Sequence, residues 1–538
     1  MSGDVFIAGG KHSFAKKQFL IFAVIMIACV TLLRVPFFSD FMFFNSDEAL
    51  FANGAHALID GDSLYHDYQV PTSPAIFFLY ATVFRLFGRY NMLALHAALL
   101  VTVLLISGLL YLIARESGHA RCAGWVAFFF GLFSHTCLGM AAFSFQAEWL
   151  VCLFCAAGVY LFIRYIQSHA RMNLLVSGAL FAAAAFSKQP AILYGLVTFL
   201  FLCWRALYTK ISLRRFAAEA FFFLFGFALI LAAAVGYFLF HNVLPEAWFW
   251  LWVYPRVYYV SALSFSERLS VFFLYFAKSL ISRNSLLYVF FVAGVVLQAR
   301  RLSFLRKQRL GSQDMCMIYF LLWGMVSYAD ASLSGRHLDY YYIVMIPSFS
   351  LVAAFAVNDL FFLARKSKRK RTPATRVTLL AIFIIFGAAF SLWRNASALR
   401  FKSTLMRDDE RSMAKMVAYL QDNTAPSDRI LMLYPAFEEV YFRARRKSAV
   451  RSYFPGIMVT CGRKRQLTEE FFRDLSMHPP RLVVEPVGKG LNFGWCECPT
   501  VLERIRGFLA RNHYVVKDTL RIGHRFIPAA RIYERQDG

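Results

Sequence analysis

The chain has 538 residues, of which 59% are hydrophobic, and 59 of them are phenylalanine. This composition excludes an ordinary soluble globular protein, because a water-soluble fold cannot bury so much apolar surface. The formal net charge of +26 does not indicate nucleic-acid binding, since the lysines and arginines gather in short segments between long apolar runs. We therefore predict a polytopic α-helical membrane protein.

The first apolar run follows a basic N-terminal segment, which predicts a cytoplasmic N-terminus and an uncleaved anchor over residues 18–37. The next segment, 38–89, carries several acidic residues and is predicted to be the first outer loop. Within it, residues 73–88 are apolar but shorter than the ~20 residues of a spanning helix. We expect that stretch to form a helix along the outer membrane surface.

Apolar runs predict about eleven transmembrane helices in all. They cover residues 18–37, 90–113, 122–139, 146–163, 172–187, 190–208, 217–241, 284–299, 315–329, 339–358 and 376–393. With this count the densest basic clusters, 300–309 and 365–371, both fall on the cytoplasmic side, as expected of positively charged loops. The same alternation predicts a C-terminus on the outer face.

The composition changes after the last predicted span. Residues 395–538 mix charged and apolar residues, and the strand-like runs DRILMLYP and PRLVVEPV alternate with helical patterns. This predicts a transmembrane domain over 1–394 and a small outer α/β domain over 395–538. If that domain is exported, one disulfide can join Cys461 to Cys496 or Cys498.

An acidic pair, Asp47-Glu48, opens the first outer loop. A carboxylate at the membrane–water interface can accept a proton from a hydroxyl group, which makes both residues candidates for catalysis. For Glu48 the alternative is a structural role at the start of a short helix. Glu148, at the outer start of a predicted span, is a candidate for contact with an acceptor or a sugar, or else a helix N-terminal charge.

Isolated cations on the outer side are candidates for binding a phosphate group. Lys188 lies between two short predicted spans, with no acidic residue nearby in sequence, and Arg336 lies in a later outer loop. Arg256 and Lys278 belong to the long outer loop predicted over 242–282. For Lys188 the alternative is a side chain that reaches the interface without a ligand.

No metal site is predicted. Asp60-Gly61-Asp62 matches the Asp-x-Asp pattern of enzymes that use nucleotide sugars, but those sugars are cytosolic and this loop is predicted to lie outside. We interpret the triplet as a turn. His66, His96 and His135 lack ligand spacing, and no other cofactor is indicated.

Four sequence elements together resemble the GT-C glycosyltransferases, in particular bacterial relatives of protein O-mannosyltransferases and of the aminoarabinose–lipid A transferase. They are Asp47-Glu48, GDSLYHDY with PTSPAIFFLYATVFRLFG (61–88), FSKQPAI (186–192) and GRHLDYYYIVMIP (335–347). One departure is Asp339, where relatives often carry histidine beside the tyrosines.

The resemblance implies an enzyme of the bacterial inner membrane with a cytoplasmic N-terminus and a periplasmic C-terminus. A polyprenyl-phosphate sugar is the implied donor, and a hydroxyl of a lipid, glycan or protein is the implied acceptor. In-line attack on the anomeric carbon would invert it. Asp47 would be the base and Glu48 its neighbour, while Tyr65, Asp67, Tyr340 and Tyr341 would join Glu148 in contacting acceptor or sugar.

Two rival hypotheses are a transporter or flippase of lipid-linked sugars and a non-catalytic scaffold. A transporter favours repeated halves and charged residues within the spans. The sequence has no visible repeat, and its acidic residues are predicted to lie in loops. Unchanged function after loss of Asp47 would favour a scaffold.

Overall fold

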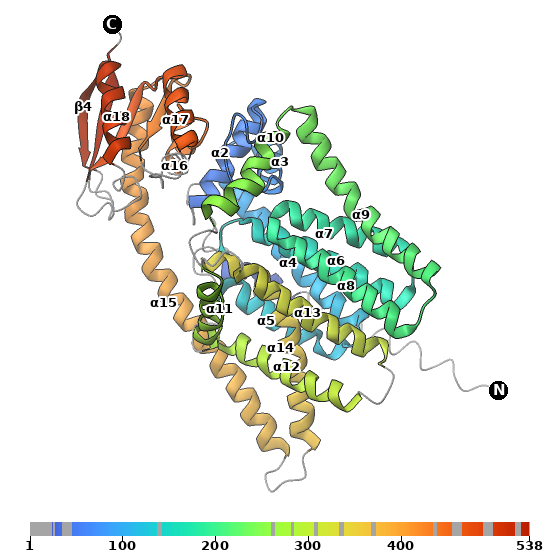
Figure 1. The fold of residues 1–538 in the computed structure, drawn as a ribbon. Helices are drawn as coiled ribbons and strands as arrows, with labels where there is room; N and C mark the ends of the chain where they lie inside the picture. Colours follow the sequence, from blue (N-terminus) through green and yellow to red (C-terminus); the bar gives the residue numbers. More distant parts are fainter. Residues whose placement is uncertain are drawn as a thin grey trace, which may run out of the picture. The chain divides into compact units, whose positions relative to one another are not determined.

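The computed structural model describes residues 24, 27–28, 30–34, 46–136, 142–259, 264–280, 285–305, 310–332, 338–366, 373–433, 438–453, 465–487, 499–521 and 529–536. The chain divides into two compact units (Figure 1). We call the first, Met1–Phe38, His96–Tyr237 and Arg256–Ala398, the helical unit. The second, Ser39–Leu95, Phe238–Pro255 and Leu399–Gly538, is the mixed unit.

Helices make up the described part of the helical unit. They are α4 (Met92–Glu116), η2 (Ala120–Cys122), α5 (Ala123–Thr136), α6 (Ala147–Ser168), α7 (Arg171–Ser187), η4 (Gln189–Ala191), α8 (Ile192–Thr209), α9 (Leu213–Phe240), α11 (Phe265–Leu280), α12 (Ser285–Leu305), α13 (Ser312–Ser332), η7 (Asp339–Met345), α14 (Ile346–Lys366) and the first part of α15 (Pro373–Asp422).

Among the described residues, 8 helices are long and apolar enough to cross a membrane. They are Met92–Glu116, Ala147–Ser168, Gln189–Thr209, Leu213–Phe240, Ser285–Ser303, Ser312–Ser332, Tyr340–Arg365 and Thr375–Arg394. Each coincides with a predicted span, which confirms the polytopic helical fold. Predicted spans 122–139 and 172–187 overlap the shorter helices α5 and α7. Most of 18–37 lies outside the described residues.

Two glycines set the distance between α7 and α9. A Cβ atom built on Gly226 would overlap the carbonyl oxygen of Leu175, and one built on Gly178 would overlap the carbonyl oxygen of Phe223. These neighbours are backbone atoms, which cannot rotate away as a side chain can. The two helices therefore approach as closely as their backbones allow.

We expect Gly226→Ala to lower the free energy of unfolding by about 3 kcal/mol, because overpacking against backbone forces the helices apart. Thermal unfolding of the purified protein in detergent measures the loss. Gly236→Ala on the same helix is the matched control, since its Cβ would meet nothing within 4 Å. Equal stability of the two variants would contradict this packing.

The mixed unit combines the first outer loop with the C-terminal region. Its elements are α2 (Ser46–Asp60), α3 (Ala75–Phe87), α10 (Leu244–Trp248), η5 (Phe249–Val253), the end of α15, β1 (Arg429–Met432), α16 (Glu438–Ala444), β2 (Lys447–Ser448), α17 (Arg465–Met477), β3 (Leu482–Val487), α18 (Pro499–Arg511), β4 (Tyr514–Arg521) and β5 (Ala529–Arg535). The helix expected over 73–88 is present as α3.

The predicted α/β region contains a 5-stranded sheet in the order β2-β1-β3-β5-β4. Strand β1 is parallel to β2 and β3, whereas β5 is antiparallel to β3 and β4. The end of α15 and helix α16 cover β1, β3 and β5 with a core that includes Met416, Val440 and Tyr441. Leu431 and Val483, on alternate strand positions, are buried as well, so both faces of the central strands are covered.

Polar contacts fasten the first outer loop to the C-terminal region within the mixed unit. Asn53 on α2 donates its side-chain amide to the Glu438 carbonyl oxygen at 2.7 Å. Lys447 lies 2.9 Å from a carboxylate oxygen of Asp62 and 3.3 Å from one of Asp60. The loop thus groups with residues beyond the predicted boundary at 394/395, which itself falls inside the continuous helix α15.

Candidate active site

A buried ion pair in the helical unit joins two of the predicted site residues. The Lys188 Nζ lies 2.7 Å from the Glu148 Oε1, and the two side chains are 17% and 3% exposed. Glu148 occupies the first turn of α6, where the helix dipole favours a carboxylate. Lys188 follows the end of α7 in an extended conformation and precedes η4, whose second residue is Pro190. The α6–α7 hairpin therefore brings the start of one helix to the end of the other.

An aromatic ring completes this arrangement. The Lys188 Nζ lies 3.9 Å from the ring centroid of Tyr341, a distance at which a cation is attracted to the ring face. Tyr341 belongs to η7, which also meets α6 where the Cys152 thiol contacts the Ile343 carbonyl oxygen at 3.5 Å. Glu148, Lys188 and Tyr341 were predicted separately, and the structure brings them together. We call these three residues the cation site.

Asp330 on α13 is a residue that the sequence analysis missed. Its side chain is buried, and neither carboxylate oxygen forms a hydrogen bond in the part of the chain that the structure describes. The charges of Lys188 and Glu148 both act on it, and the Tyr194 hydroxyl lies close to it. The expectation that acidic residues lie only in loops was therefore wrong. The available signal was an acidic residue at the end of an apolar run.

Arg34 is a second buried charge within an apolar segment. Its guanidinium donates to the carbonyl oxygens of Ala142 at 2.9 Å and Ser134 at 3.2 Å. It also lies 5.4 Å from the Trp149 ring centroid and 5.7 Å from that of Phe143. These contacts fix the segment that leads into α6, and hence the position from which Glu148 projects.

In the mixed unit, Asp47 and Glu48 form the first turn of α2. Glu48 is fully buried, whereas Asp47 is half-buried. Both charges act on the buried Tyr80 of α3. Considering the described residues alone, the Asp47 side chain is still reached by solvent. Glu48 is buried, as expected of a residue with a structural role beside Asp47. Their catalytic roles stay predictions.

Glu438, at the start of α16, is an acidic neighbour of Asp47 that the sequence did not reveal. Burial raises the pKa of its carboxyl group well above the usual value, and the charge of Asp47 raises it further, while a backbone hydrogen bond opposes both. Burial and the nearby charge of Asp47 thus both disfavour the ionised form of the Glu438 carboxyl. Its Oε2 has no hydrogen-bond partner among the described residues.

Tyr65 and Asp67 shape the turn that follows α2. Tyr65 is fully buried with φ +74°, and its hydroxyl donates to the Thr72 carbonyl oxygen at 2.9 Å. Asp67 accepts from the Ser63 amide at 2.8 Å and contacts the His66 Nδ1 at 2.9 Å. Although partial burial opposes the change, these partners lower the pKa of Asp67. Contact of either residue with a sugar stays a prediction.

The predicted turn at Asp60-Gly61-Asp62 is present. Gly61 has φ +94°, a conformation that glycine adopts without a steric penalty. The flanking carboxylates both contact Lys447. In the described ranges, no group of at least 3 His, Cys, Asp or Glu residues is arranged to hold a metal ion.

The remaining predicted residues lie in η7, η6 and α11, or outside the described part of the chain. Tyr340 is half-buried in η7, with its ring edge-on to Tyr341 at 4.8 Å between centroids. Arg256 is exposed in the π-helical turn η6 (Pro255–Tyr259). Lys278 belongs to α11, although its side chain lies outside the described part. The positions Arg336, Cys461, Cys496 and Cys498 lie outside the described residues.

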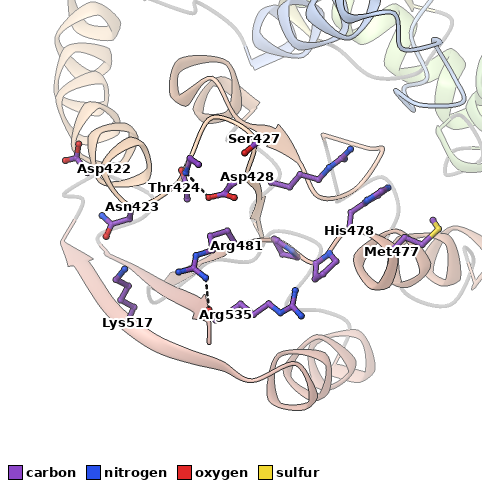
Figure 2. Close-up of a pocket in the computed structure, with 14 residues that line it drawn as sticks. Asp422, Asn423, Thr424, Ser427, Asp428, Met477, His478, Arg481, Lys517 and Arg535 are labelled. Atoms are coloured by element: carbon purple, nitrogen blue, oxygen red, sulfur yellow. Dashed lines mark hydrogen bonds between the residues drawn. The ribbon is translucent and has the colours of Figure 1, made fainter. Parts of the chain in front are cut away.

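A wide polar hollow in the C-terminal region contains none of these predicted residues (Figure 2). It has a volume of about 920 Å³, and its lining includes Arg429, His478, Arg481 and Lys517. It lies at the amino ends of the parallel strands β1 and β3, whereas ligands of open α/β sheets bind at the carboxyl ends. We therefore do not assign the reaction to this hollow.

Comparisons with known proteins agree with this architecture. Residues 70–238 match the family model described as dolichyl-phosphate-mannose-protein mannosyltransferase. A search of curated protein sequences finds no match.

Solved structures share the fold at low sequence identity. ArnT from Cupriavidus metallidurans in the apo state has a TM-score of 0.58 at 13% identity, covering 96% of this chain and 98% of that one. The same protein bound to undecaprenyl phosphate gives 0.55 at 12%, with coverages of 96% and 98%. The archaeal oligosaccharyltransferase AglB from Archaeoglobus fulgidus, in complex with an inhibitory peptide and a dolichol-phosphate, gives 0.56 at 12%, with coverages of 88% and 70%.

The family match includes α3, α6 with Glu148, and Lys188 after the end of α7. In the comparison with ArnT, the shared fold extends over nearly the whole length of both chains. The chain therefore has the fold of ArnT and AglB, and its residues 70–238 match the mannosyltransferase family model.

Proposed function

We propose that the protein is an inverting glycosyltransferase that moves a sugar from a polyprenyl-phosphate donor to an acceptor hydroxyl at the periplasmic face of the inner membrane. The observation that carries the proposal is the cation site, where a part-buried lysine contacts a buried glutamate and a tyrosine ring. The ligands in two similar structures, undecaprenyl phosphate and dolichol-phosphate, support the class of donor.

In the proposed reaction, the acceptor oxygen attacks the anomeric carbon of the sugar. The bond from that carbon to the phosphate oxygen breaks, and polyprenyl phosphate leaves with the bonding electron pair. Asp47 takes the hydroxyl proton, and Glu48 holds the loop that carries Asp47. The developing negative charge needs a cation, because an unscreened phosphate is costly away from water.

Lys188 is the proposed cation, and Glu148 is its partner until the phosphate arrives. A phosphate oxygen would replace or share the Glu148 contact on the ammonium group. The released Glu148 carboxylate could then accept a hydrogen bond from a sugar or acceptor hydroxyl, with Tyr341 and Tyr340 lining the same place. Arg336, Arg256 and Lys278 are proposed as additional phosphate contacts, and Tyr65 and Asp67 as acceptor or sugar contacts.

The transporter hypothesis gains one observation, because Asp330 is a carboxylate buried within a span. The fate of the donor lipid distinguishes a transferase from a transporter. A transferase breaks the sugar–phosphate bond, whereas a flippase moves the intact lipid.

Mass analysis of envelope glycans from cells lacking the protein tests the proposal. We expect one sugar to be missing from one class of lipid, glycan or protein. Intact glycans of every class would contradict the proposal.

The proposed orientation gives a separate prediction. Alkaline phosphatase fused after residue 400 should be active, because that position is proposed to be periplasmic, and a fusion at 305, within a basic cluster, should be inactive. Activity of the fusions in cells is the measurement. The reverse pattern would overturn both the orientation and the assignment of Lys188 to the outer face.

A further inference from the structure

We propose that the buried carboxylate of Asp330 is a positioning residue that limits how tightly the cation site holds phosphate, so that polyprenyl phosphate can leave after transfer. This inference rests on the proposed function, because it requires Lys188 to bind the phosphate group. It assigns a role to a residue that the reaction itself does not use.

The first argument is the unbalanced charge around Lys188. One ammonium group interacts with two carboxylates: it pairs directly with Glu148 at 2.7 Å, and it interacts electrostatically with Asp330. Asp330 is only 3% exposed, and within the described ranges neither of its oxygens has a hydrogen-bond partner. Burying a carboxylate without such partners is costly. A protein that needed only a neutral, well-packed α13 would be more stable with an apolar residue there.

The second argument is the electrostatic interaction of Asp330 with the pair. Its charge interacts with Lys188 and with Glu148, and with the thiol of Cys152, one helical turn beyond Glu148 on α6. Asp330 therefore acts electrostatically on the cation site, while Lys188 makes its direct contact with Glu148. Charges interact strongly over several ångströms in such an environment.

The third argument is the change of phosphate charge during the reaction. The donor is a phosphodiester and carries one negative charge, whereas the product is a monoester with a second ionisation near neutral pH. A negative charge that acts on the cation site therefore repels the product more strongly than the donor. Asp330 thus lowers the affinity for the spent carrier at little cost in affinity for the loaded one.

The test is binding of undecaprenyl phosphate to purified full-length protein in nanodiscs. Asp330→Asn removes the charge at nearly constant size, and we expect it to lower the Kd for undecaprenyl phosphate about tenfold. The KM for the sugar-loaded donor should fall less, and inhibition by the product should become stronger. A merely structural role predicts the opposite sign, since a loosened site binds both lipids more weakly.

Two further variants keep the outcome decisive. Asp330→Leu also removes the charge and suits an apolar environment, so it should give the same tightening if Asp330→Asn folds poorly. Asp359→Asn is the matched control, because Asp359 on α14 contacts Gln298 at 3.0 Å and not the cation site. We expect it to leave the Kd unchanged.

A companion variant, Lys188→Met with Glu148→Gln, separates the inference from the proposed function. If it binds undecaprenyl phosphate as the wild type does, the phosphate does not bind at Lys188 and the proposed function fails at this site. If it binds weakly while Asp330→Asn and Asp330→Leu leave the Kd unchanged or raise it, the proposed site survives and the role of Asp330 is overturned.

Discussion

Replacing Asp47 with asparagine should lower the transfer rate by about 10²–10⁴-fold, the range typical for loss of a general base. Asparagine keeps the size and one oxygen but cannot take the proton from the acceptor. Asp47 is half-buried at the start of α2.

The measurement for Asp47→Asn is the transfer rate of the purified protein, beside binding of the donor lipid. We expect binding to survive. Glu48→Gln should cost less, because Glu48 is fully buried. Asp62→Asn is the matched control in the same loop, since its carboxylate contacts Lys447 at 2.9 Å. Near-normal turnover of the Asp47→Asn variant would exclude Asp47 as the base, and Glu48 or Glu148 would then be the candidates.

Removing the Lys188 charge should weaken use of the donor by roughly ten- to a hundredfold, the usual loss for a contact with a charged group. The ion pair adds a second consequence. Lys188→Met leaves the Glu148 carboxylate buried without its partner, which typically costs about 3 kcal/mol or more of stability. Activity of that single variant therefore mixes lost binding with lost folding.

The double variant Lys188→Met with Glu148→Gln resolves the two effects. It removes both buried charges, so the melting temperature should return towards that of the wild type. Donor binding should remain weak, because no ammonium group is left for the phosphate. Recovery of donor binding together with stability would show that Lys188 acts only through folding.

The spans were predictable because their signal is local. About 20 consecutive apolar residues identify a crossing helix wherever it lies in the chain, and the eight long helices agree with that rule. Helices α5 and α7 are shorter, with 14 and 17 residues. Their length gives a weaker signal, and the close approach at Gly178 and Gly226 cannot be inferred from composition.

The site was only partly predictable because its groups meet through tertiary structure. Lys188 and Glu148 were each identified, but their contact spans 40 residues and depends on how the α6–α7 hairpin closes. Asp330 was missed because a loop location was assumed for every carboxylate. Glu438 was missed because nothing in the sequence near it indicates that α16 packs beside α2, where Asn53 fixes its backbone.

The most direct test of the proposed chemistry follows the donor itself. Purified protein in nanodiscs would receive a polyprenyl-phosphate sugar, labelled in the sugar, with an extract of envelope acceptors. We predict release of free polyprenyl phosphate in step with labelled acceptor, and neither product with Asp47→Asn. Labelled lipid that crosses the bilayer intact, with no free polyprenyl phosphate formed, would contradict the proposal and identify a transporter.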